Sequence, residues 1–180
     1  KKFGKEGDFI TSPELGALFA QCHARLFQPV LASFDDAVVL ELGAGMGSFC
    51  HDVLLALDDI NQLPKAYWIL EISADLKQQQ QQKIAQLPPH LSEKVIWLDA
   101  LPVQKFNGVI FGNEVLDALP VEVFCQQGQS KQRLMINDEA GQLTEQWVTF
   151  PSDLAQQLAG KNLELEAGYR SEFIPHLTEW

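Results

Sequence analysis

Several features that mark membrane, secreted and nucleic-acid-binding proteins are scarce in this sequence. Its 180 residues include 13 basic and 24 acidic side chains, so the formal net charge is −11. Such a charge disfavours binding to nucleic-acid phosphates. No apolar run approaches the roughly 20 residues of a membrane-spanning helix, and residues 1–8 lack the apolar stretch of a signal peptide. We expect a soluble, cytoplasmic protein without a nucleic-acid partner, although a mitochondrial matrix protein whose presequence was removed would look the same.

Cysteine is also rare. The three cysteines, Cys22, Cys50 and Cys125, are too few for a disulfide framework, and none belongs to a Cys-x-x-Cys pair. We expect reduced, buried thiols. Histidines follow two of them, at His23 and His51, but adjacent residues do not have the spacing of zinc ligands. We therefore expect no metal site.

The composition is that of a globular protein, since 46% of the residues are hydrophobic, and the length suits one domain. Ser12 and Pro13 are typical of a helix start, and apolar residues at helical spacing follow until Pro29, where we expect the helix to end. Beyond it, strands are predicted at 38–42, 67–70, 95–98 and 109–111, with helices at 49–57 and 73–87. This alternation predicts an α/β fold with a parallel βαβ sheet.

The pattern changes after Pro120. Three short strand-like runs, at 121–125, 132–136 and 143–148, predict an antiparallel meander. Ser152 then caps a helix that runs through Leu158 and is closed by Gly160. Residues 168–180 show no clear period. We therefore divide the chain into an N-terminal mouth and helix (1–34), a cofactor-binding core (35–120), a meander (121–150) and a helix with a C-terminal segment (151–180).

A run of glutamines, 78–82, lies inside the second predicted helix. Leu76, Ile84 and Leu87 flank the run at roughly helical intervals. We therefore interpret the glutamines as the solvent-facing side of that helix.

A glycine-rich turn lies between the first strand and its helix. Gly43, Gly45 and Gly47 allow a ligand to approach the backbone closely, and the helix start beyond them offers unpaired N–H groups. Ser48 stands where the dinucleotide fingerprint G-x-G-x-x-G wants its third glycine. Glu41 can accept a hydrogen bond from, or electrostatically favour, the cationic amino-acid end of S-adenosylmethionine, and it would repel a pyrophosphate.

Carboxylates also follow the next two strands. Glu71 is placed to accept hydrogen bonds from both ribose hydroxyls of a nucleoside, and Asp99 to hold the adenine amino group. A ribose-binding carboxylate is shared with NAD proteins, and acidic residues at strand ends are often plain loop residues. The three carboxylates together favour S-adenosyl-L-methionine over NAD as the cofactor.

The fourth strand leads into Asn113, Glu114 and Asp117. Ligands of open α/β sheets bind beyond the carboxyl ends of the strands, so these side chains are the candidates for catalysis. A structural interpretation stays open, in which Asp117 caps a short turn and Glu114 is simply solvated. The D/N-P-P-Y sequence of DNA amino-methyltransferases is absent after this strand.

Four blocks resemble the MidA family of S-adenosylmethionine-dependent methyltransferases: residues 5–14, the glycine turn, residues 113–121 and residues 168–172. The resemblance implies a Rossmann-like class I methyltransferase sheet that later strands would complete, so we expect this chain to be part of a longer protein. It also implies that Thr11 and Ser12 belong to the mouth of the cofactor or substrate site. The implied acceptor is a protein arginine, such as one of a respiratory complex I subunit.

The resemblance thus predicts a protein arginine methyltransferase that dimethylates its substrate. Arginine keeps its proton, so carboxylates that grip one side of the guanidinium would free the opposite nitrogen to attack. Glu114 is the first candidate for this role and Asp117 the second. The alternative is an assembly or scaffold protein that retains a cofactor pocket but acts by binding a partner. Arg170 is expected to pair with Glu172 rather than with one of the carboxylates of the cleft.

Overall fold

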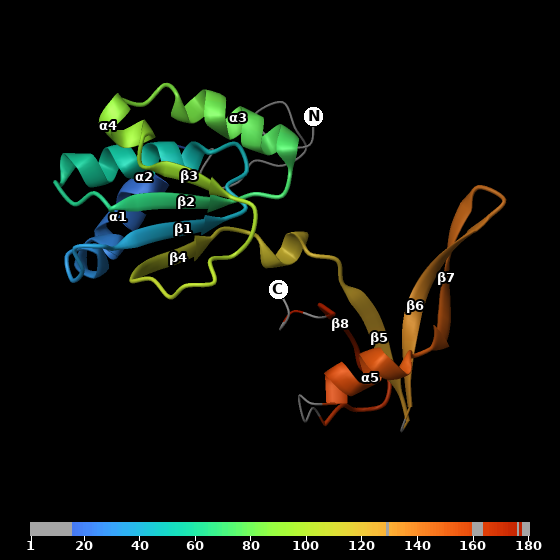
Figure 1. Cartoon of the computed structure of the whole chain (residues 1–180). Helices are drawn as coiled ribbons and strands as arrows, with labels where there is room; N and C mark the ends of the chain where they lie inside the picture. Colours follow the sequence, from blue (N-terminus) through green and yellow to red (C-terminus); the bar gives the residue numbers. More distant parts are fainter. Residues whose placement is uncertain (1–15, 129, 160–163, 176, 178–180) are drawn as a thin grey trace. The chain divides into compact units, whose positions relative to one another are not determined.

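The computed structural model describes residues 16–128, 130–159, 164–175 and 177, and it divides after Val115 into two compact units. Each unit has its own sheet (Figure 1). The predicted start of the first helix, at Ser12 and Pro13, lies outside the described residues. No helix in the described ranges is long and apolar enough to cross a membrane.

The first unit contains a sheet of four parallel strands in the order β3-β2-β1-β4. The strands are β1 (Val38–Leu42), β2 (Ala66–Leu70), β3 (Val95–Leu98) and β4 (Gly108–Gly112). Their carboxyl ends meet at one edge, where the arrowheads lie in Figure 1. The sheet confirms the predicted α/β fold. The order places the glycine turn after a central strand, between the carboxyl ends of β2 and β4.

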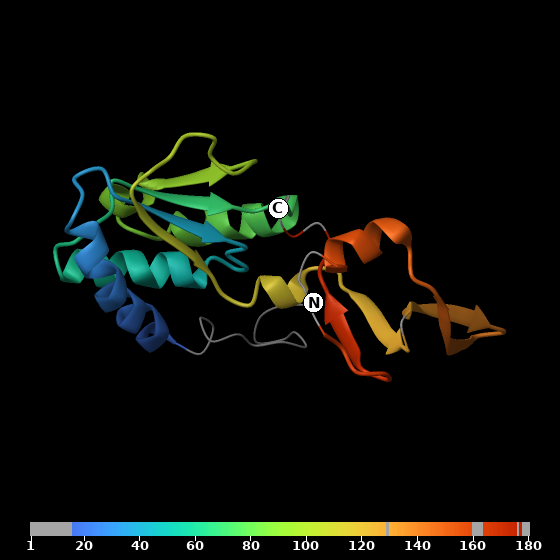
Figure 2. The ribbon, with the colours of Figure 1, turned by 90° about the horizontal axis from the view of Figure 1, so that it is seen from below.

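The core of this unit lies on one face of the sheet. Val39, Tyr67 and Val95 share that face because they are paired in register, and they pack with buried residues of the helices. The helices are α1 (Ala17–Leu31), α2 (Ser48–Asp59), α3 (Ala74–Ile84) and the short α4 (Pro89–Ser92). Helices α1 and α2 pack side by side (Figure 2).

The end of α1 differs from the prediction. Pro29 lies inside the helix, which continues to Leu31. Proline removes one backbone donor, but Phe27 and Leu31 are buried on either side of it, and the Ala32 N–H donates to the Gln28 carbonyl at 2.9 Å. Burial of the last turn therefore outweighs the lost hydrogen bond.

The second unit is an antiparallel sheet in the order β7-β6-β5-β8. Its strands are β5 (Glu122–Gln127), β6 (Ser130–Glu139), β7 (Gln142–Thr149) and β8 (Arg170–Phe173). The predicted meander is confirmed, whereas β8 was missed. Helix α5 (Ser152–Ala159) contributes Leu154 and Leu158 to a small core with Phe124 and Phe150. The 3-10 helix η2 (Leu116–Ala118) begins the unit.

Two side-chain predictions need correction. All three cysteines are free, but Cys22 is exposed while Cys50 and Cys125 are buried. The exposure follows from the position of Cys22 on the outer side of α1. Arg170 pairs with Glu145 at 3.4 Å and stacks over Trp147 at 5.3 Å, instead of pairing with Glu172. Glu145 and Trp147 both belong to β7, which does not pair with β8, so a tertiary contact decides the partner of Arg170.

Candidate functional site

The turn between β1 and α2 has the backbone conformation that its glycines predict. Gly43, Gly45 and Gly47 have φ angles of 63°, 53° and 77°, a region in which side chains with a Cβ are disfavoured. A Cβ on Gly47 would also lie 3.3 Å from the Cα of Gln80. Gly47 is therefore needed both for the backbone conformation of the turn and for the close packing of α3 against it.

Helix α2 begins directly after this turn. Its N-cap residue is Gly47, which has no side chain to cap the helix, and the Gly47 N–H donates to the Ala44 carbonyl at 2.8 Å. The first backbone N–H groups of a helix lack partners within the helix and carry its positive dipole end. This arrangement suits a ligand carboxylate or another anionic group.

Glu71 lies just beyond the end of β2, beside the turn. Its Oε1 accepts from the Ser73 N–H at 2.9 Å, and its Oε2 accepts from the Gln80 amide at 3.1 Å. Ser73 in turn caps α3 by accepting from the Leu76 N–H. Because each carboxylate oxygen has two acceptor positions, each retains capacity for another donor. Glu71 can therefore accept a pair of hydroxyls while held in place.

Gln80 corrects the interpretation of the glutamine run. Its side chain is 0% exposed and connects three parts of the first unit. The Nε2 donates to the Gly45 carbonyl at 2.9 Å and to Glu71, while the Oε1 accepts from Trp97 Nε1 at 3.0 Å. Neighbouring Gln81 and Gln82 are exposed, as predicted. The run thus has one buried member, which the prediction missed.

Glu41 is buried beneath the turn. Its side chain is 3% exposed, and its Oε2 accepts from the Tyr67 hydroxyl at 2.8 Å. Burial raises the pKa of Glu41 to about 7, the Tyr67 hydrogen bond opposes the rise, and the charge of Glu71 adds to it. Burial also raises the pKa of Tyr67. The carboxylate therefore belongs to a buried pair with Tyr67.

Asp99 follows β3 at the same edge of the sheet. Its side chain is 93% exposed and pairs with Lys77 of α3, with 3.1 Å between Lys77 Nζ and Asp99 Oδ1. Such an exposed ion pair is weak and leaves the carboxylate accessible to a competing donor.

The segment after β4 carries the candidates for catalysis. Asn113 is half-buried and Glu114 is exposed, with a φ of 53°. Among the described residues, the other two non-glycine residues with positive φ, Asn61 and Ala140, lie in turns. The left-handed conformation costs Glu114 about 1 kcal/mol. Asp117 belongs to the second unit, where it is exposed on η2.

Thr11 and Ser12 lie outside the described residues. Within the described ranges, no group of three or more His, Cys, Asp or Glu side chains has a geometry suited to a metal ion.

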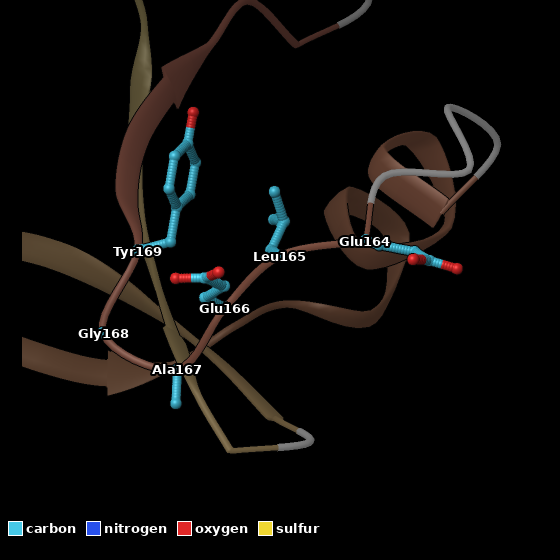
Figure 3. A pocket seen from close by; sticks show the side chains of 6 residues that line it. All are labelled: Glu164, Leu165, Glu166, Ala167, Gly168 and Tyr169. Atoms are coloured by element: carbon cyan, nitrogen blue, oxygen red, sulfur yellow. The ribbon is translucent and has the colours of Figure 1, made fainter.

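A hollow of about 620 Å³ lies in the second unit, lined by residues 164–169 (Figure 3). Its two carboxylates, Glu164 and Glu166, point in different directions in Figure 3, so they do not form a paired acid–base site. The hollow is open, and Leu165, Ala167 and Gly168 supply no reactive group to it. We do not assign it a function.

Spacing along α3 could have revealed Gln80. The buried positions Gln80 and Ile84 are four residues apart, as are Leu76 and Gln80, so the three residues lie along one side of the helix. A polar residue in an otherwise apolar stripe is a signal of a buried hydrogen-bond network. No pattern in the sequence indicates that Trp97 donates the third hydrogen bond to Gln80.

Comparisons with known proteins identify relatives of this chain. A protein arginine methyltransferase NDUFAF7 homolog, mitochondrial, of Caenorhabditis elegans is 31% identical over 157 residues, which cover 76% of this chain and 36% of the relative. The Drosophila melanogaster protein of the same name is 32% identical over 143 residues, covering 66% of this chain and 32% of that protein. The chain thus spans about a third of the length of these curated relatives.

Solved structures extend the likeness to three dimensions. A crystal structure from Burkholderia thailandensis, bound to S-adenosyl-homocysteine, has a TM-score of 0.81 and 35% sequence identity, covering 97% of this chain and 46% of that chain. A native crystal structure from the same organism has a TM-score of 0.78 and the same identity, covering 96% of this chain and 46% of that chain. Residues 15–180 match the family described as "Putative S-adenosyl-L-methionine-dependent methyltransferase". The chain belongs to this family of methyltransferases.

Proposed function

We propose that this chain binds S-adenosyl-L-methionine at the carboxyl edge of its parallel sheet and takes part in methyl transfer to a protein arginine. The cofactor assignment rests on the glycine turn, whose three glycines have positive φ angles. The Gln80 amide connects this turn to the Glu71 carboxylate at the end of β2. A related protein, 35% identical over nearly the whole chain, has been crystallised with S-adenosyl-homocysteine.

Each side chain at this edge receives a role in the proposal. The turn of Gly43, Gly45 and Gly47 would hold the amino-acid end of the cofactor, and Glu71 would accept from the ribose hydroxyls. Asp99 would accept from the adenine amino group in place of Lys77. Such an arrangement fixes the donor methyl group for an in-line attack, which supplies much of the catalysis in methyl transfer.

Glu41 receives an indirect role. Because its carboxylate is buried and held by Tyr67, it would act on the cofactor through its charge beneath the turn. A negative charge at low dielectric favours a nearby ammonium or sulfonium group. With its pKa raised to about 7, the group is only partly ionised at neutral pH.

The transfer itself forms a bond between a guanidinium nitrogen and the methyl carbon, and it breaks the carbon–sulfur bond of the sulfonium. The bonding pair stays on sulfur, giving S-adenosyl-homocysteine, and the nitrogen releases one proton to solvent. The exposed Glu114 carboxylate is our first candidate for gripping the guanidinium and orienting its lone pair. Asp117 is the second candidate and Asn113 a third, as a neutral hydrogen-bonding group.

The arginine acceptor is supported by the names of the relatives, both called protein arginine methyltransferases. The net charge of −11 also favours encounter with a cationic protein segment at low salt. A subunit of a respiratory complex is the acceptor that the family resemblance suggests.

The proposal has two tests. Calorimetric titration with S-adenosyl-homocysteine should show binding, and mass spectrometry should detect methylated arginine in an acceptor protein after incubation with S-adenosyl-L-methionine. Glu114→Gln should retain cofactor binding and lose methylation, with the exposed Glu93→Gln as a control that changes neither. A protein that binds cofactor and partner without any methylation would instead be an assembly factor. Absence of cofactor binding would refute the proposal.

A further inference from the structure

We infer that Gln80 is a positioning residue of the cofactor site: its side-chain amide holds the glycine turn and the Glu71 carboxylate in a fixed relation. The inference rests on the proposed function, since it assigns Gln80 to the site where the cofactor would bind. The residue itself does not have to touch the ligand.

The orientation of the Gln80 amide is unambiguous. The indole N–H of Trp97 can only donate, so the Gln80 oxygen must face it at 3.0 Å. The amide nitrogen then faces two acceptors, the Gly45 carbonyl at 2.9 Å and Glu71 Oε2 at 3.1 Å. Both N–H groups and the oxygen are therefore engaged, and the side chain is fully buried. Rotation of the amide would break all three hydrogen bonds at once.

The first consequence concerns Glu71. Gln80 holds one of its carboxylate oxygens, and the Ser73 N–H holds the other at 2.9 Å. A carboxylate held at both oxygens cannot rotate freely, so its remaining acceptor positions keep fixed directions. A fixed pair of acceptors is what recognition of two neighbouring hydroxyls requires. Without Gln80, one of these two constraints is lost.

The second consequence concerns the turn. The carbonyl of Gly45 points toward Gln80 on α3, and the peptide that follows it is trans. In a trans peptide the N–H points opposite to the carbonyl, so the Met46 N–H is directed away from α3. Gln80 thereby sets the direction of a backbone donor in the turn that would receive the amino-acid end of the cofactor.

Neighbouring Ile84 in the same stripe of α3 is apolar and 2% exposed, so the stripe as a whole does not require polar residues. An apolar side chain at position 80 would leave the Gly45 carbonyl, the Glu71 carboxylate and the Trp97 N–H without this partner, which costs stability. Two of these three partners belong to the proposed site, so the same amide that stabilises the fold also positions the groups that would contact the cofactor.

The test uses Gln80→Met, which keeps the length and helix propensity of the side chain but removes its hydrogen-bonding groups. Calorimetric titration with S-adenosyl-homocysteine should show affinity weakened at least tenfold. The matched control is Gln81→Met, the same substitution on the exposed side of the run, which should bind within twofold of the unchanged protein. Trp97→Phe is a second variant that removes only the donor to Gln80, and it should weaken binding severalfold.

A positioning role also predicts non-additivity. When Glu71→Ala is present, adding Gln80→Met should cost much less affinity than it costs in the unchanged protein, because one of its two targets is gone. A merely structural role would lower the melting temperature and leave the two effects on affinity additive. If the unchanged protein binds and Gln80→Met and Trp97→Phe both bind within twofold of it, this inference is overturned and the proposed function stands. If the unchanged protein does not bind, the proposed function itself fails.

Discussion

Replacing Glu41 with glutamine should change how the stability of the first unit depends on pH. Burial raises the pKa of this carboxyl from 4.5 to about 7, with the Tyr67 hydrogen bond opposing the rise and Glu71 adding to it. The folded state therefore binds the proton more tightly than the unfolded state. The resulting stabilisation is fully present below the unfolded pKa of 4.5 and is lost as the pH rises through about 7.

A rise in pKa of this size corresponds to a difference of about 3 kcal/mol in free energy of unfolding between acidic pH, where the carboxyl is protonated, and alkaline pH, where it is ionised. Glutamine keeps a carbonyl oxygen that can accept from the Tyr67 hydroxyl at the position of Glu41 Oε2, but it does not ionise. Relative to the unchanged protein, Glu41→Gln should therefore gain up to about 3 kcal/mol in free energy of unfolding at about pH 9, and much less near pH 4.

Hydrogen exchange of the β1 and β2 amides in increasing urea measures the opening of the first unit separately from the second. Tyr67→Phe is the companion variant. It removes the hydrogen bond that favours the ionised form, so the pKa of Glu41 rises further and the loss of stability should extend to higher pH. If Glu41→Gln and the unchanged protein show parallel stability profiles across this range, the reasoning about the buried carboxyl is wrong.

Three other substitutions test the backbone. Gly47→Ala should cost at least about 1 kcal/mol in urea unfolding and weaken binding of S-adenosyl-homocysteine, since its Cβ meets Gln80 at 3.3 Å in a left-handed conformation. Glu114→Gly should raise the free energy of unfolding by up to about 1 kcal/mol, because it relieves a positive φ. It should also abolish methylation, because it removes the carboxylate proposed to grip the guanidinium. Gly108→Ala should prevent folding of the first unit, measured by circular dichroism, because its Cβ would lie 1.8 Å from the Val38 carbonyl oxygen. A soluble, folded Gly108→Ala protein, or no change in either other variant, would contradict these expectations.

The strands of the parallel sheet were predictable because they are continuous apolar runs. β1 and β3 have the predicted bounds, and β2 and β4 differ by one residue at their ends. Buried parallel strands need no alternation of polar and apolar residues, so a short apolar run bounded by turn residues identifies them. The glycine turn was equally readable, since repeated glycines after a strand indicate positive φ angles.

Other elements depend on tertiary contacts that no local pattern records. β8 is a four-residue strand whose pairing partner, β5, lies over 40 residues earlier in the chain. Pro29 was expected to end α1, yet the helix continues because its last turn is buried. Local signals set the preference in both cases, and packing decided the outcome.

For the candidate site, sequence reasoning placed carboxylates at strand ends but did not reveal their hydrogen-bond partners. Glu71 lies beside the glycine turn as expected, held by Gln80 and Ser73. Glu41 lies in a buried pair with Tyr67, which its position before the glycines does not indicate. Side chains of a strand alternate between the two faces of the sheet. Whether a carboxylate near a strand end is buried therefore depends on which face the helices cover.

The proposed function requires that the cofactor lies against the glycine turn and the end of β2. Hydrogen exchange with and without S-adenosyl-homocysteine tests it directly. We expect slower exchange in residues 43–48 and 71–76 when the ligand is present, with no change in the β6–β7 hairpin of the second unit. Protection confined to the hairpin, or unchanged exchange at the turn despite measured binding, would contradict it.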